Sequence, residues 1–156
     1  MKLLTGSLGT LGVITAATVK VKPISEQTTT VVAIVPNGHS GEAAIASMLV
    51  SEATPVAVQW LQGDCWQQLC GGGSKTASQS IMAIQLAGTT AEVDWSQATV
   101  LRELKSAGLT DGSILDPTQQ QALWSAICEF PANDAELVIQ VKTVSSGVVE
   151  VIAKCC

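Results

Sequence analysis

Glycine recurs every three residues near the start of the chain, at Gly6, Gly9 and Gly12. Because glycine has no Cβ and adopts positive φ readily, such a backbone can approach a flat or phosphorylated ligand closely and point N–H groups at it. Ser7 and Thr10 lie between these glycines and add hydroxyl groups that can bond ligand oxygens. By spacing alone, a ligand-binding turn and a plain turn before an edge strand are equally good interpretations.

A second glycine-rich segment, residues 71–76, superficially resembles a nucleotide phosphate loop. That loop needs glycine directly before its lysine and another glycine five residues earlier. These two positions hold Ser74 and Leu69. We therefore interpret the segment as a hairpin tip and expect no nucleoside triphosphate site there.

The remaining polar residues predict neither a metal site nor a hydrolytic triad. His39 is the single histidine, and it lies in a Pro-Asn-Gly-His-Ser turn where it is either a surface residue or a contact to substrate or partner. The acidic residues are scattered and are typical of helix caps and solvated faces. No catalytic base can be assigned from the sequence.

Tryptophan and cysteine allow two interpretations each. Trp60 and Trp66 lie among glutamines and either line a pocket or pack in the core, and the core is favoured. Trp95 and Trp124 are interpreted as packing residues on amphipathic helices. The cysteines are Cys65, Cys70, Cys128, Cys155 and Cys156. Their spacing fits neither a metal site nor a disulfide framework, so we interpret them as reduced thiols in the cytoplasm. Lipidation of the last two is the less favoured alternative.

Periodicity and capping residues predict the elements that position these groups. Strands are predicted at residues 15–22, 28–35, 56–61, 80–86 and 137–141. Helices are predicted at residues 42–52, 94–107 and 117–128. Their predicted capping residues are Ser40, Asp94 and Asp116, the last of which opens a capping box. A last helical segment is predicted after residues 145–147. This order predicts an α+β, ferredoxin-like domain with an antiparallel sheet and its helices on one face.

The composition excludes several classes of protein. With 47% hydrophobic and 13% charged residues and a mean hydropathy of +0.36, the chain of 156 residues is too apolar to be disordered. No apolar run reaches the roughly 18 residues of a membrane-spanning helix. The net charge of −5 disfavours binding to nucleic acid, since phosphate contacts depend on Lys and Arg.

One segment resembles a known family. The string Gly-Ser-Leu-Gly-Thr-Leu-Gly-Val-Ile-Thr at residues 6–15, continued by Thr-Val-Lys-Val-Lys-Pro at 18–23, resembles the last flavin-contacting motif of FAD-linked oxidases of the vanillyl-alcohol-oxidase (PCMH) type. The FAD-binding subunits of glycolate oxidases are the most similar members. The resemblance implies that FAD is contacted by Gly6, Ser7, Gly9, Thr10, Leu11, Gly12, Val13 and Ile14.

The resemblance also implies a domain organisation. Residues 1–24 would end an FAD-binding domain, and residues 25–156 would form most of the C-terminal cap domain over the substrate site, truncated at its end. In this family the glycine loop that binds the pyrophosphate precedes the motif, so tight FAD binding is expected to require that upstream half.

The implied activity is the oxidation of a small 2-hydroxy acid such as glycolate, with hydride passing to the flavin and electrons passing to other subunits of a glycolate-oxidase-like complex. The isolated chain is expected to be inactive. The alternative is a non-catalytic ferredoxin-like module that binds a protein partner or small molecule and uses its glycine-rich start only as a turn.

Overall fold

The computed structural model describes residues 6–21, 23–70, 80–130 and 150. Within them, four strands form one open sheet in which every neighbouring pair is antiparallel. The strands are β1 (Gln27–Val35), β2 (Ala57–Gln62), β3 (Ser80–Gly88) and β4 (Thr110–Ile114). The helices are α1 (Gly38–Val50), α2 (Asp64–Leu69), α3 (Thr90–Ser106) and α4 (Pro117–Glu129).

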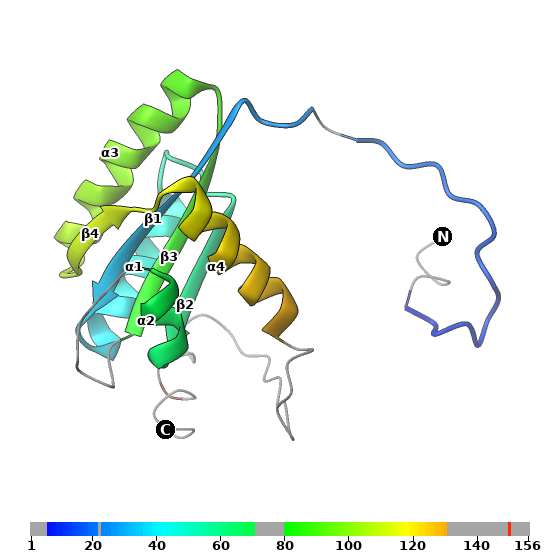
Figure 1. Cartoon of the computed structure of the whole chain (residues 1–156), viewed down its shortest axis with the longest axis horizontal. Coiled ribbons are helices and arrows are strands. Elements are labelled where there is room, and N and C mark those ends of the chain that lie inside the picture. Colours follow the sequence, from blue (N-terminus) through cyan, green and yellow to red (C-terminus); the bar gives the residue numbers. More distant parts are fainter. Residues whose placement is uncertain (1–5, 22, 71–79, 131–149, 151–156) are drawn as a thin grey trace.

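The strand order is β2-β3-β1-β4, so β1 and β3 are central and β2 and β4 are the edges (Figure 1). Helix α1 connects β1 to β2 across β3, and α3 connects β3 to β4 across β1. These interleaved β-α-β connections are compatible with a ferredoxin-like fold. The predicted α+β class and antiparallel sheet are therefore confirmed.

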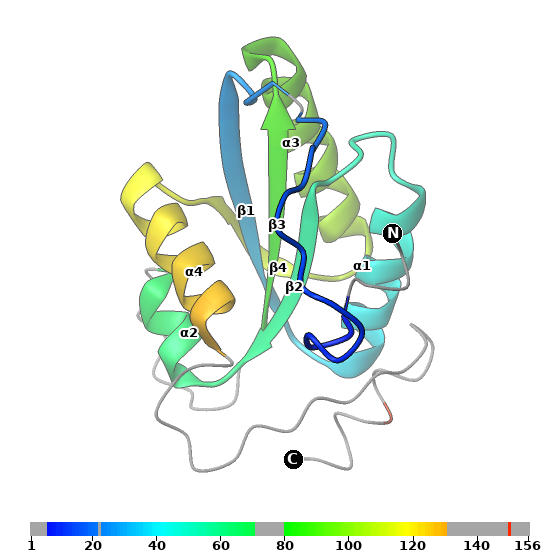
Figure 2. The same ribbon diagram turned by 90° about the vertical axis from the view of Figure 1, so that its right-hand side faces the viewer.

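Helices cover both faces of the sheet, so the prediction that they lie on one face is wrong (Figure 2). On one face, α1 and α3 bury Val31, Ala33, Met82 and Ile84. On the other face, α2 and α4 cover a smaller cluster formed by Val32, Leu61, Trp66, Ile81, Ala83, Leu115 and Leu123. The physical reason is that the central strands carry apolar residues at successive positions, which leaves both faces needing cover.

Two helices begin earlier than predicted because other residues cap them. Asn37, not Ser40, caps α1, and its side chain accepts a hydrogen bond of 2.9 Å from the Ser40 N–H. Thr89, not Asp94, caps α3 and forms a capping box with Glu92. The capping box of α4 is confirmed, with Asp116 accepting from the N–H groups of Thr118 and Gln119.

The predicted strands agree with the structure only in part. Strands β1, β2 and β3 match the predictions for 28–35, 56–61 and 80–86 closely. Residues 15–21 are exposed and form no strand, because no neighbouring strand in the described chain pairs with them, so that prediction is wrong. Strand β4 was not predicted, and the predictions for 137–141 and for the segment after 145–147 lie outside the described residues.

Candidate functional site

The glycine-rich segment forms a tight turn. Gly6 and Gly9 have φ values of 84° and 80°, in the left-handed region that glycine occupies without strain, and Leu8 between them has a φ of 51°. The Thr10 N–H donates to the Ser7 carbonyl at 3.0 Å, and the Thr10 hydroxyl donates to the same oxygen at 2.6 Å. The hydroxyl of Thr10 therefore braces the turn.

The turn is open to close approach. A Cβ added at Gly6 or Gly9 would meet no heavy atom within 4 Å. The motif's apolar side chains are uncovered as well, with Leu8 97% and Val13 83% exposed. A flat ligand could thus reach this backbone directly, with apolar side chains beside it.

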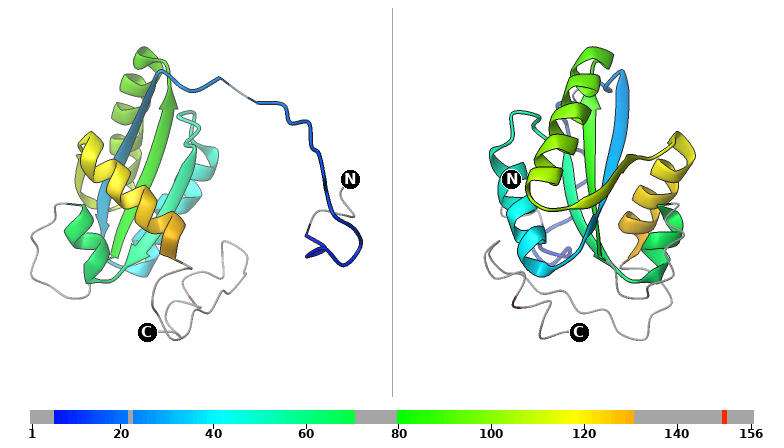
Figure 3. Two further views of the ribbon diagram at one scale, coloured as in Figure 1. Left: turned by 45° about the vertical axis from the view of Figure 1, so that its right-hand side comes forward. Right: turned by 90° about the vertical axis from the view of Figure 1, so that its left-hand side faces the viewer.

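The turn lies at the end of an exposed segment, residues 6–21, which we call the arm. Figures 1 and 3 show the arm leaving the start of β1 and running away from the sheet. All of its side chains are exposed apart from the half-buried Ser7. The structure therefore places the eight predicted flavin contacts in one turn and its continuation, and none of the described helices and strands covers them.

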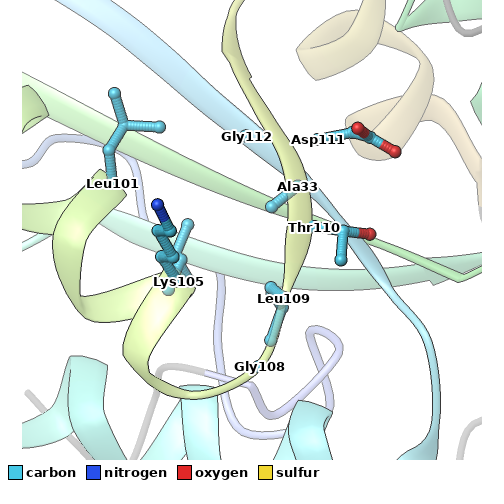
Figure 4. A pocket seen from close by; sticks show the side chains of 9 residues that line it. Ala33, Leu101, Lys105, Gly108, Leu109, Thr110, Asp111 and Gly112 are labelled. Atoms are coloured by element: carbon cyan, nitrogen blue, oxygen red, sulfur yellow. The ribbon is translucent and has the colours of Figure 1, made fainter.

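A second candidate feature lies at the β4 edge of the sheet, between α3 and β4 (Figure 4). A hollow of about 650 Å³ is lined by the apolar side chains of Leu101, Leu104 and Leu109. Lys105 is the one cation in its lining. Asp111 on β4 also borders the hollow, but its carboxylate lies on the other side of the strand (Figure 4). None of these residues was predicted from the sequence to form a site.

The tryptophans divide between core and surface. Trp66 is 8% exposed and its ring centroid lies 5.8 Å from that of Phe130, so its assignment to the core is confirmed. Trp60 packs against the α1/α3 core and against Gly41, with its Nε1 buried and without a hydrogen-bond partner. Trp95 is 50% exposed, so its interpretation as a packing residue is wrong.

Trp95 is exposed because it lies on a different side of α3 from the buried stripe that includes Val93 and Val100. There it lines a polar hollow of about 320 Å³ together with Glu52 and Glu92. The pKa of Glu92 is lowered, first by the backbone N–H of Thr89 and then by the Thr89 hydroxyl, both of which donate to its carboxylate.

The other candidate groups are the histidine and the cysteines. His39 is exposed in the first turn of α1, in agreement with its interpretation as a surface residue. Cys65, Cys70 and Cys128 are free thiols, and burial raises the pKa of Cys70, which lowers its reactivity. Residues 71–76 and Cys155 and Cys156 lie outside the described residues.

The described residues offer neither a metal centre nor a membrane span. None of their His, Cys, Asp and Glu side chains form a group of three or more that could hold a metal ion. No helix in the described part of the chain is long and apolar enough to cross a membrane.

Comparison with known proteins does not identify a family for this chain. No protein-family model matches the chain, and a search among curated proteins finds no match. The similarity of the arm to a flavin-contacting motif therefore depends on the residues of the arm themselves.

Proposed function

We propose that this chain belongs to an FAD-dependent oxidoreductase that oxidises a small 2-hydroxy acid such as glycolate. In this proposal residues 1–24 end the FAD-binding domain, and residues 25–156 form the cap over the substrate site. The observation that carries the proposal is an open glycine turn at the tip of an apolar, uncovered arm. Both features are expected of a segment that completes a cofactor site.

The exposed side chains of the arm support this assignment energetically. Leu11, Val13, Ile14, Val19 and Val21 are each more than half exposed. Burial of apolar surface contributes roughly 25 cal/mol per Å², so such a segment gains stability when another structure covers it. An FAD-binding domain whose last strand is this arm would provide that cover.

The residues of the turn fit the cofactor. Gly6, Gly9 and Gly12 would allow the isoalloxazine ring or the phosphates of FAD to approach the main chain. Leu11, Val13 and Ile14 would shield the ring from water. Ser7 and Thr10 would hold the turn in shape, since the Thr10 side chain is bonded to the Ser7 carbonyl. When bound, FAD supplies the redox chemistry by accepting hydride from the carbon that bears the hydroxyl group.

The α+β domain after the arm supports the role of a cap. It has its own core on both faces of the sheet, so it can move or dock as a unit. We place the protein in the cytoplasm, as a subunit of a glycolate-oxidase-like complex, because Cys65, Cys70 and Cys128 are unpaired thiols.

The test joins this chain to an FAD-binding half that carries a pyrophosphate loop, and measures the flavin that co-purifies. We expect the joined protein to retain flavin and glycolate or a related 2-hydroxy acid to bleach its absorbance. A joined protein that folds and retains no flavin would overturn the proposal. Flavin that no 2-hydroxy acid reduces would overturn the assigned substrate class.

The alternative, a non-catalytic binding module, is favoured by one observation, the apolar hollow between α3 and β4. A module of this kind uses the glycine segment only as a turn. A bulky residue at Gly9 would then leave binding to its partner unchanged, whereas the same substitution should abolish flavin retention in the oxidoreductase.

A further inference from the structure

Strand β4 is an open edge of the sheet. It is last in the strand order of the described chain and pairs on one side with β1. All five of its residues are exposed. Apart from a bulge between Thr110 and Ser113, where Asp111 has a φ of 52°, this edge presents backbone N–H and C=O groups to which another extended segment can pair.

The two faces beside this edge are both partly apolar but differ in charge. Toward α3 lies the hollow of about 650 Å³ with its leucine lining. Gly112 allows Leu101 to pack close to β4, because a Cβ there would lie 2.9 Å from Cδ2 of Leu101. Figure 4 shows Leu101 and Lys105 on one side of β4 and the Asp111 carboxylate on the other. A segment added along β4 would thus meet the leucine-lined hollow on one face. On the other face it would meet the Asp111 carboxylate at a second hollow of about 300 Å³, which Val32 and Ile81 help to line.

The arm has the pattern that this edge requires. Val19 and Val21 alternate with Lys20, so in an extended strand the two valines share one face and the lysine lies on the opposite face. The valines are 74% and 78% exposed, and Lys20 is also exposed. The edge strand β2 offers no such match, since its residues Ala57–Gln62 include no charged side chain.

We propose that two copies of this chain exchange arms, with residues 18–21 of each copy added as a strand to β4 of the other. Val19 and Val21 lie over the hollow beside Leu101, and Lys20 lies against Asp111 of the second copy. The contact is reciprocal, so each dimer contains the Lys20 to Asp111 pair twice. Each uncovered arm thereby covers the open edge of its partner.

The exchange of arms goes beyond the proposed function and does not depend on it. The same arm cannot pair with β4 and also lie within an FAD-binding domain. Joining the chain to an FAD-binding half is therefore expected to release the dimer.

Sedimentation velocity of the purified chain over a range of concentrations tests the exchange. We expect a monomer–dimer equilibrium that Lys20→Asp and Asp111→Lys each weaken several-fold, since each substitution replaces an attractive cross-strand charge pair with two like charges at both contacts. When the two variants are mixed, both contacts of the heterodimer again join opposite charges. The two substituted side chains face each other at one contact, and the native Lys20 faces the native Asp111 at the other. The mixture should therefore recover the wild-type dissociation constant.

Glu129→Lys is the control, because it changes the net charge as Asp111→Lys does but lies exposed on α4. It should leave the dissociation constant unchanged. Thermal unfolding of each variant confirms that it folds. A chain that stays monomeric at every concentration would overturn the inference, as would a dimer that both charge variants leave intact or a mixture that recovers nothing. Protection of β4 amides from hydrogen exchange in a monomer would show that the arm folds back on its own edge, which also overturns it.

Discussion

The indole N–H of Trp124 on α4 donates a hydrogen bond of 2.8 Å to Oγ1 of Thr30, which is fully buried in the middle of β1. The Thr30 hydroxyl in turn donates to Gln120 Oε1 at 3.1 Å, and the Gln120 amide donates to the Thr28 carbonyl at 3.2 Å. A buried polar side chain in a central strand is thus satisfied by one helix. This network attaches α4 to the sheet face that was expected, from the sequence, to carry no helix.

Replacing Trp124 with phenylalanine should destabilise the domain by about 1–2 kcal/mol, because the ring is kept while the donor to a buried hydroxyl is lost. Urea unfolding followed by circular dichroism measures the change. Trp95→Phe is the matched control, since Trp95 is half exposed, and it should change the free energy of unfolding by less than about 0.5 kcal/mol. Equal effects of the two substitutions would contradict the role of the network.

Gly41→Ala should destabilise the domain by about 1–3 kcal/mol, although alanine is the better helix former. The added Cβ would lie 2.5 Å from Cη2 of Trp60, so α1 or the indole must shift. Trp60→Leu should relieve the clash, so the two substitutions together should cost less than the sum of their separate effects. If the two free-energy changes simply add, the clash between the new Cβ and Trp60 is not what destabilises Gly41→Ala.

The capping box of α3 should make stability depend on pH. Hydrogen bonds from Thr89 lower the pKa of Glu92 in the folded chain, so the stabilisation is complete above the ordinary glutamate value of about 4.3 and is lost as the pH falls through the lowered pKa. Glu92→Gln keeps an acceptor but cannot titrate. The stability difference between wild type and this variant should therefore shrink in acid, and a difference that is constant with pH would contradict the assignment.

The apolar strands and one helix cap could be predicted from sequence because their signals are local. β1 and β3 carry long apolar runs, and the Asp116-Pro117 capping box marks the start of α4 unambiguously. Ser40 and Asp94 are good capping residues too, but Asn37 and Thr89 precede them and take the caps. Local propensity cannot rank two competent residues in neighbouring turns.

The elements that could not be predicted from the sequence lack an apolar signal. β4 reads Thr-Asp-Gly-Ser-Ile, which is typical of a turn, and it becomes a strand because β1 pairs with it. The hollow beside it arises from the packing of α3 against that strand, which no spacing in the sequence encodes. The glycine turn, by contrast, could be predicted because Gly6 and Gly9 adopt the positive φ that their residue type favours.

The purified chain alone should retain no stoichiometric flavin and show no turnover with glycolate. In the proposed function the turn would contact one side of the cofactor. The pyrophosphate needs a glycine loop at a helix N-terminus, which the family resemblance implies upstream of the turn. Gel filtration after incubation with FAD, followed by absorbance of the protein peak, makes the measurement. One flavin bound per chain would contradict this prediction.

The most direct test of the proposed function is flavin retention by the joined protein after Gly9→Trp. A bulky side chain at this positive-φ position would occupy the open approach to the turn, and we predict loss of most bound FAD with unchanged folding of the α+β domain. Ala17→Trp, also on the exposed arm but outside the motif, should retain FAD. Full retention of flavin by Gly9→Trp would contradict the assignment of this turn to the cofactor.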